Sequence, residues 1–146
     1  MSADATLDEI KTMAASLSPW AHIATVGADG APDVVPVHPG WEGDMMWTMI
    51  GADSVKARNV AANPEVALHW QVTGVGDGVE VWGTASVHTD VETKRRLWDG
   101  VFDYNLTDFS PGGPDDSPNI AFLAVEPSRA LILYTYGTKG MKRWSR

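Results

Sequence analysis

Short apolar runs separated by glycine, proline and aspartate recur along this chain, and they constrain its fold more than any other feature. Runs of this length, rich in Val, Ile, Trp and Thr, are typical of β-strands. They cover residues 20–26, 34–37, 45–50, 66–72, 79–88, 120–125 and 130–136. A parallel sheet needs a helix after nearly every strand, and this chain has too few. We therefore predict a mainly β protein, a β-barrel with short helices.

The segments between these runs carry typical turn residues. Residues 27–30 read GADG and predict a hairpin between the first two strands. Residues 38–43 are expected to form a loop, and Pro127 is expected to separate the last two strands. Residues 103–118 are polar and rich in proline and glycine. This segment is too long for a simple connection, so we expect it to be functional or mobile.

Three segments carry helix start signals. Thr6 and Glu9 have the spacing of a capping box, and apolar residues follow at helical intervals. Ser54 begins an alanine-rich segment that ends at residues 63–64, which are Asn-Pro. Asp90 is expected to cap a third helix. All three predicted helices are short.

Composition limits the classes of protein and of site. A chain of 146 residues is expected to form one domain, residues 1–146. The absence of cysteine excludes disulfides and thiolate sites, and the net charge of −8 opposes binding to nucleic acid. No apolar stretch is long enough for a membrane helix and the start of the chain lacks the basic residues of a signal peptide, so we expect a cytoplasmic protein. The four histidines lack metal-ligand spacing, and no metal site is predicted.

The distribution of basic residues suggests an anion site. Within residues 12–92, Lys56 and Arg58 are the only basic residues, and both follow Ser54 in the first turns of the second predicted helix. Unpaired backbone N–H groups and the helix dipole at such a start favour a phosphate, which Ser54 and Lys56 are then expected to grip. The alternative is that Ser54 only caps the helix and both cations are solvated. Residues two apart do not face the same side of a helix, so Lys56 and Arg58 are not expected to share one anion.

Several motifs occur in the order found in a known family. Residues 24–37 look like a first hairpin, and Trp47-Thr48 precedes residues 54–68, which read SVKARNVAANPEVAL. Residues 79–85 read VEVWGTA, and residues 96–116 contain GGPDD after the third predicted helix. In this order the chain resembles the pyridoxamine 5'-phosphate oxidase-like FMN-binding split-barrel family, in particular its general-stress-protein-like subgroup.

The resemblance implies an FMN-binding split β-barrel that forms a homodimer with two cofactor sites at the subunit interface. By motif, Lys56 and Ser54 are implied to contact the cofactor phosphate. Thr48 is implied to lie on the strand edge beside it. Trp47 precedes Thr48 and is a further cofactor-binding candidate.

The resemblance also assigns residues to the flavin ring. The backbone of Val35, Pro36 and Val37 is implied to line the isoalloxazine, and Arg143 occupies the place of a basic residue that reaches the cofactor or substrate from the partner subunit. For Arg143 the alternative is a solvated basic tail. Trp41 and Trp70, together with Trp47, are candidates to line the ring or substrate pocket, with burial in the core as the alternative role.

The resemblance implies an FMN-dependent oxidoreductase that transfers hydride to or from a small organic substrate. The cofactor performs this chemistry, so the sequence assigns no catalytic residue. The oxidase has a basic residue directly before the lysine and basic residues on the preceding strand. This chain has Val55 before the lysine, and its strand at residues 34–37 reads VVPV, without a basic residue. These differences weaken the case for pyridoxamine phosphate as substrate. The alternatives are a deazaflavin-dependent reductase of the same fold and a non-catalytic flavin-binding stress-response module.

Overall fold

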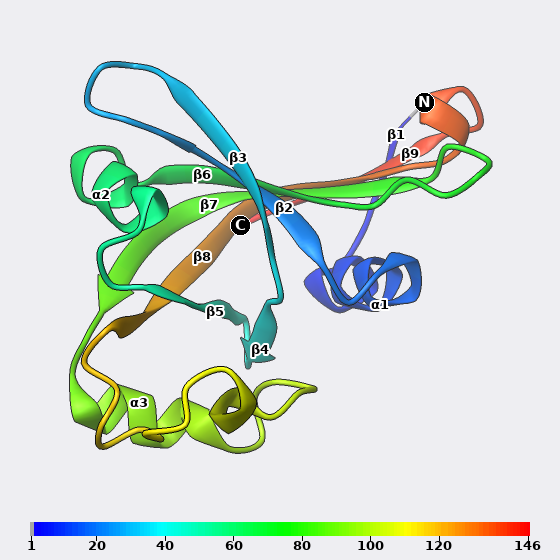
Figure 1. Ribbon diagram of the computed structural model, residues 1–146. Coiled ribbons are helices and arrows are strands. Elements are labelled where there is room, and N and C mark those ends of the chain that lie inside the picture. Colours follow the sequence, from blue (N-terminus) through cyan, green and yellow to red (C-terminus); the bar gives the residue numbers. More distant parts are fainter. Residues whose placement is uncertain (1) are drawn as a thin grey trace.

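The computed structural model describes residues 2–146, and strands make up most of it (Figure 1). The strands are β1 (Ser2–Asp4), β2 (Ala21–Val26), β3 (Pro32–Val37), β4 (Gly40–Glu42), β5 (Met45–Gly51), β6 (Glu65–Trp70), β7 (Gly78–His88), β8 (Ile120–Leu133) and β9 (Met141–Ser145). The helices are α1 (Leu7–Leu17), α2 (Val55–Ala62) and α3 (Val91–Trp98), with 3-10 turns at Leu106–Asp108 and Thr135–Gly137. The prediction of a mainly β protein with short helices is confirmed.

The nine strands of the described residues form one sheet. Its order is β1-β9-β8-β7-β6-β2-β3, with β5 on β8 and β4 on β5. Neighbouring strands are antiparallel except β1 and β9, which are parallel. One edge of β8 pairs with β7, whereas the other pairs first with β5 and then with β9. Strand β8 therefore joins the two parts of the sheet.

The three helices begin at the predicted caps. The hydroxyl of Thr6 accepts a hydrogen bond from the backbone N–H of Glu9 at 3.1 Å. Ser54 accepts from the N–H of Ala57 at 3.3 Å, and Asp90 accepts from the N–H of Thr93 at 2.9 Å. Each side chain satisfies a backbone donor that the first turn leaves without an intrahelical partner.

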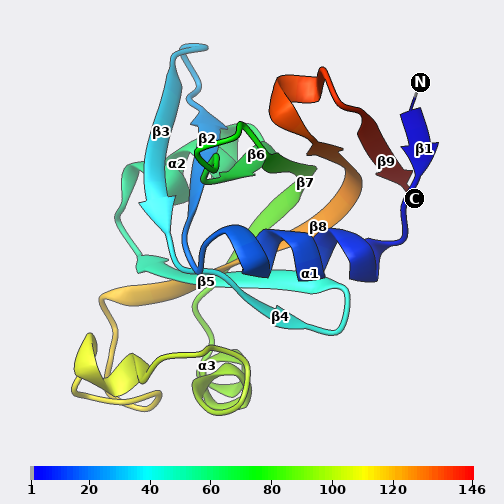
Figure 2. The same ribbon diagram turned by 90° about the vertical axis from the view of Figure 1, so that its right-hand side faces the viewer.

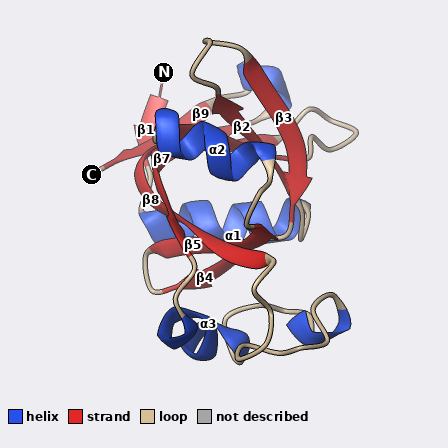
Figure 3. Ribbon diagram, turned by 60° about the vertical axis from the view of Figure 1, so that its left-hand side comes forward, coloured by secondary structure: helices blue, strands red, loops and turns tan. Residues whose placement is uncertain are grey.

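The largest hydrophobic core lies between the sheet and two helices. Ile10 of α1 and Val60 of α2 belong to the same buried cluster as the inward side chains of β2, β6, β7 and β8. Figures 1 and 3 show α1 and α2 at opposite ends of the sheet, so each helix closes one end of this core. No helix of residues 2–146 is both long and apolar enough to span a membrane.

A second core covers the opposite face of β5 and β8. Along β5, Met46 and Ile50 contact the main core, whereas Trp47 packs with Phe122 of β8 and Leu97 of α3. Figures 1 and 2 show α3 and the following segment beyond β5, away from the rest of the sheet. This part of the sheet is therefore buried on both faces. The segment 103–118, expected to be functional or mobile, is packed here through a fully buried Leu106.

The last two predicted strands form the single strand β8. Pro127 has no N–H to donate, but it lies between the end of the β5 pairing at Val125 and the start of the β9 pairing at Arg129. The register with β7 also shifts here, between Trp82 and Gly83. The proline therefore breaks no ladder hydrogen bond, and the predicted interruption is wrong.

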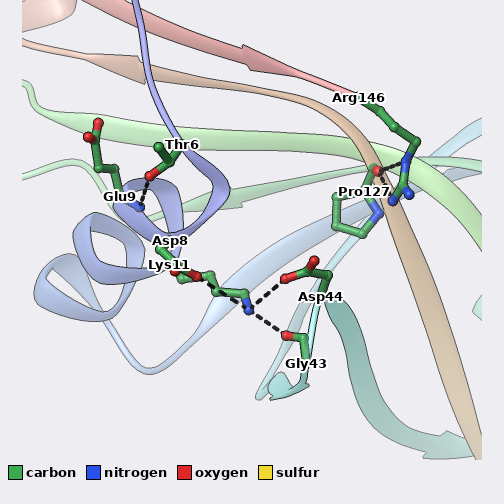
Figure 4. Close-up of polar contacts among 8 residues, drawn as sticks. All are labelled: Thr6, Asp8, Glu9, Lys11, Gly43, Asp44, Pro127 and Arg146. Carbon is green, nitrogen blue, oxygen red and sulfur yellow. Dashed lines mark hydrogen bonds and ion pairs between the residues drawn. The ribbon is translucent and has the colours of Figure 1, made fainter.

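The chain also forms strands that the sequence did not reveal. Residues 38–43, expected to be a loop, contain β4, which pairs with β5 across a turn at Gly43 and Asp44. The ammonium group of Lys11 in α1 bonds the carbonyl oxygen of Gly43 and the carboxylate of Asp44, the latter at 3.3 Å (Figure 4). This contact ties α1 to the β4–β5 turn.

At the other end of the chain, residues 141–145 form β9 instead of a solvated tail. Arg146 then folds back, and its guanidinium donates to the carbonyl oxygen of Pro127 at 2.8 and 3.2 Å (Figure 4). This contact fixes the end of the chain beside the bulge in β8.

Candidate functional site

A cleft of about 520 Å³ lies beside the start of α2, between β3, β5 and the segment that follows α3. This volume is in the range of pockets that hold small molecules and cofactors. The residues that line the cleft are Trp20, Pro36, Val37, His38, Met49, Lys56, Tyr104 and Phe109. They come from five separate parts of the chain, so only the fold brings them together.

Lys56 is the one lysine or arginine among the lining residues of this cleft. No carboxylate among the described residues lies within ion-pair distance of its ammonium group. The N–H groups of Val55 and Lys56 have no intrahelical acceptor because they lie in the first turn of α2. Ser54 uses its oxygen as the cap acceptor, so its hydroxyl proton is available to a ligand. These groups are suited to a phosphate.

Strand β3 supplies the neighbouring wall of the cleft. Pro36 and Val37 line it, and alternation along the strand puts Val35 and Val37 on the face that packs against the main core and Pro36 on the other face. Strand β3 pairs only with β2, so its second edge carries no partner strand among the described residues. A flat ligand can therefore approach this edge, where Pro36 prevents the addition of another strand.

Aromatic rings form another part of the cleft lining. The His38 ring stacks on the Tyr104 ring, with centroids 4.2 Å apart, and meets the Trp20 ring edge-on at 6.0 Å. The Nε2 atom of His38 hydrogen-bonds Oδ1 of Asp103 at 2.5 Å. Burial raises the pKa of the Tyr104 hydroxyl above its usual value, and the charge of Asp103 raises it further. Tyr104 is therefore neutral at physiological pH.

The structure distributes the sequence-predicted residues between the cleft and its surroundings. Lys56, Pro36 and Val37 line the cleft, and Ser54 caps the helix that begins there. Thr48 is 3% exposed, and its neighbour Trp47 is buried in the second core. These two residues point to opposite faces of β5, and neither lines the cleft.

Two basic residues lie away from the cleft. The guanidinium of Arg58 donates to the backbone oxygen of Asp53, consistent with the expectation that Lys56 and Arg58 do not share an anion. Arg143 lies on β9 in a separate hollow with Trp82 and Arg129, which shares no residue with the Lys56 cleft. Arg143 therefore does not line the Lys56 cleft.

The tryptophans that line the cleft differ from those expected. Trp70 is buried in the main core, and Trp41 packs against that core with Lys11 over its ring at 4.9 Å. Trp20, just before β2, lines the cleft instead and is 57% exposed. Its position directly after Pro19, at the start of the first predicted strand, is the sequence signal that could have identified it. His38, Met49, Tyr104 and Phe109 carried no comparable signal.

The fold and cleft define a class of protein, a split β-barrel with an aromatic cleft at the start of a short helix. More particularly, the chain belongs to the pyridoxamine 5'-phosphate oxidase family, whose profile matches residues 7–134. The resemblance inferred from the sequence motifs is confirmed. Among curated proteins, no sequence matches the chain.

Solved structures share the fold. A Clostridium acetobutylicum protein related to general stress protein 26 of Bacillus subtilis has a TM-score of 0.73 at 17% identity, covering 90% of this chain and 92% of its own. An FMN-binding, pyridoxamine 5'-phosphate oxidase-related protein of Nostoc punctiforme has a TM-score of 0.67 at 17% identity, covering 94% and 86%. A protein described as an F420 reductase has a TM-score of 0.58 at 25% identity, covering 78% and 90%.

Proposed function

We propose that this protein is an FMN-dependent oxidoreductase that transfers hydride to or from a small organic substrate in the cleft beside α2. The observation that carries the proposal is the position of Lys56, which has no ion-pair partner in the part of the chain that the structure describes and lies in a cleft that aromatic rings also line. The similarity to an FMN-binding relative supports the same cofactor. Bound FMN supplies the redox chemistry, and the protein supplies binding, orientation and exclusion of water.

The residues of the cleft suit the two parts of FMN. Lys56, the hydroxyl of Ser54 and the free N–H groups of the first turn of α2 would hold the phosphate. Pro36, Val37 and the aromatic side chains of the cleft would contact the flat ring. Thr48, Trp47 and Val35 lie on the elements beside these residues and would act through the shape of the site. No acid–base dyad is required for the hydride transfer itself.

We further propose that the protein works as a cytoplasmic homodimer with the cleft at the subunit interface. Trp20 is 57% exposed, Phe109 is 71% exposed, and Val34 and Val55 lie nearby at 61% and 45%. Apolar side chains gathered around a cleft are typical of a surface that a partner covers. Arg143 would then contribute to the site of the partner subunit, since it does not line its own.

The deazaflavin coenzyme is the second candidate, favoured by the similarity to the protein described as an F420 reductase. It also presents a phosphate and a flat ring to the cleft. Its longer anionic tail would need a basic groove, and Lys56 is the one cation that lines this cleft. The net charge of −8 therefore favours FMN.

The first experiment is an absorbance spectrum of the purified protein, with mass spectrometry of the molecule that denaturation releases. We expect a flavin spectrum and the mass of FMN. Release of deazaflavin instead would establish the second candidate. A colourless protein that takes up neither in titration would overturn both. A flavin-loaded protein that neither NAD(P)H nor an organic acceptor reduces or oxidises would be the non-catalytic binding module.

The second experiment tests the phosphate site. Lys56→Ala should weaken FMN binding about tenfold to a hundredfold, because a charge-assisted contact is lost. Binding of riboflavin, which has no phosphate, should change less than about twofold. Arg58→Ala is the matched control, since it removes the same charge from the same helix outside the cleft. Equal FMN affinity of Lys56→Ala and wild type would remove Lys56 from the site.

A further inference from the structure

The cleft contains an acid–base pair that hydride transfer alone does not use. His38 lies in the loop after β3 and lines the cleft, whereas Asp103 lies in the segment after α3. The 2.5 Å contact between His38 Nε2 and Asp103 Oδ1 joins the two segments. No hydrogen bond of the described residues involves His38 Nδ1, so this nitrogen is available to a ligand.

The surroundings of His38 fix its ring and keep it connected to solvent. Tyr104 stacks on one face and Trp20 meets the ring edge-on, so the imidazole has little freedom to rotate. The side chain of His38 is 23% exposed, and that of Asp103 is 67% exposed. A carboxylate that holds one nitrogen of a histidine sets its tautomer and stabilises the charged ring, leaving the other nitrogen for proton transfer. The exposed carboxylate allows the pair to regain its proton from water.

Reduction of a polarised carbon–carbon double bond consumes a hydride and a proton. The hydride forms a bond at one carbon, the π bond breaks, and its electron pair must take up a proton at the other carbon. The two electrons come from the reduced flavin-type cofactor, which is oxidised as the substrate is reduced. Of the lining side chains, His38 has a ring nitrogen without a hydrogen-bond partner among the described residues, whereas the raised pKa of Tyr104 makes its hydroxyl a weaker acid and Lys56 is assigned to the phosphate.

We propose that His38 donates this proton to a substrate with a polarised carbon–carbon double bond, and that Asp103 is its positioning residue. The inference rests on the proposed function, because the hydride must come from a cofactor in the same cleft. It adds a substrate class and an acid to that function. The charged and titratable groups that face His38 are Asp103 and Tyr104 from the segment after α3 and Lys56 from α2.

The test uses the cofactor-loaded protein and 2-cyclohexen-1-one as probe. The reduced protein is mixed with the probe without oxygen, and reoxidation of the cofactor is followed by stopped flow.

His38→Gln should slow reoxidation at least about a hundredfold, the usual contribution of a general acid. Its amide can still donate to Asp103, so the cleft should keep its shape. Asp103→Asn should slow it less, about tenfold. The rate of wild type should depend on pH, whereas that of His38→Gln should be flat.

Two measurements separate this inference from the proposed function. FMN affinity of His38→Gln should stay within about twofold of wild type, as should that of the control His88→Gln, a partly exposed histidine at the end of β7 outside the cleft. In the cofactor-free protein, diethylpyrocarbonate should modify both histidines, and bound FMN should protect His38 but not His88. Failure of wild type to bind FMN or deazaflavin would end the proposed function. A loaded protein with an unprotected His38, equal rates in His38→Gln, or no reaction with the probe would overturn the inference alone.

Discussion

Gly83 shows how a single position can determine the course of the sheet. It lies in β7 at the register shift, where a Cβ atom would stand 2.4 Å from the backbone oxygen of Glu126 and 2.8 Å from Val125 Cγ1. The backbone cannot retreat, because β7 also pairs with β6 on its other edge at this residue. Only glycine allows β8 to approach here while it bends past Pro127.

Gly83→Ala is therefore expected to lower the free energy of unfolding by about 2–3 kcal/mol, the cost of an added methyl group in tight packing. Chemical denaturation followed by tryptophan fluorescence measures this change. Gly74→Ala is the control, since a Cβ atom added at Gly74 would have no neighbour within 4 Å and the φ of this residue is not positive. This control should stay within about 0.5 kcal/mol of wild type. Similar losses for both variants would contradict the steric explanation.

Tyr104 makes stability depend on pH in the alkaline range. Its folded-state pKa is raised, first by burial and then by Asp103, so the unfolded chain releases this proton at lower pH than the folded one. The stabilisation is fully present below the unfolded pKa, near 10, and is lost as pH rises through the folded pKa. Between about pH 9 and pH 11, wild type should lose more unfolding free energy than Tyr104→Phe. Parallel curves for the two proteins would show that Tyr104 ionises equally in both states.

The sequence predicted one kind of cleft residue and missed another. Lys56 could be predicted because a lone cation at a helix start is visible in the charge pattern. His38 and Tyr104 could not, because they lie 66 positions apart on two irregular segments that meet only after β5 and β8 have paired. Trp47 and Thr48 were predicted to bind the cofactor. Successive residues of β5 point to opposite faces, so Trp47 packs in the second core and Thr48 is buried on the other side of the strand.

At the scale of elements, boundaries were predictable where local chemistry decides them. The cap residues Thr6, Ser54 and Asp90 mark the helix starts because each satisfies a donor within its own turn. Strand β4 was missed because its partner alone makes it a strand, and β8 was divided because a proline normally ends one. In both cases the pairing of distant residues overrides the local pattern.

Helix α2 allows the two roles of Ser54 to be separated. Ser54→Ala should lower the free energy of unfolding by about 1 kcal/mol, because the cap bond to the N–H of Ala57 is lost. Ser54→Asp retains a good cap and suits the helix dipole, so its stability should remain close to wild type. Its negative charge should nevertheless weaken FMN binding about tenfold or more, through repulsion of the phosphate.

Thermal denaturation and FMN titration measure the two effects, and riboflavin is the control ligand for the second. Riboflavin affinity should be the same for Ser54→Asp and wild type, because no phosphate approaches the cap. If Ser54→Asp binds FMN as tightly as wild type, Ser54 is only a helix cap. The phosphate would then be held elsewhere along the cleft.

At the scale of the whole molecule, charge and apolar exposure act in opposite directions on association. Each chain carries a net charge of −8, so two copies repel each other at low ionic strength. The apolar side chains around the cleft favour contact, and β3 is an edge strand whose prolines oppose strand-to-strand pairing. A second copy is therefore expected to pack through side chains, and added salt should strengthen the dimer by screening the repulsion.

Val34 and Val75 provide a matched test of that dimer, since each is 61% exposed. Val34 shares a strand face with Pro36 of the cleft, whereas Val75 lies in the turn between β6 and β7. Val34→Asp places a charge on the proposed interface and should shift the protein from twice the chain mass of 15.8 kDa to that of one chain in light scattering. Val75→Asp should leave the mass unchanged.

Because the cofactor site is proposed to need both subunits, Val34→Asp should also lose FMN affinity while keeping its circular dichroism spectrum. A Val34→Asp protein that stays dimeric, or a wild type that is monomeric with full FMN affinity, would separate the cleft from any subunit interface.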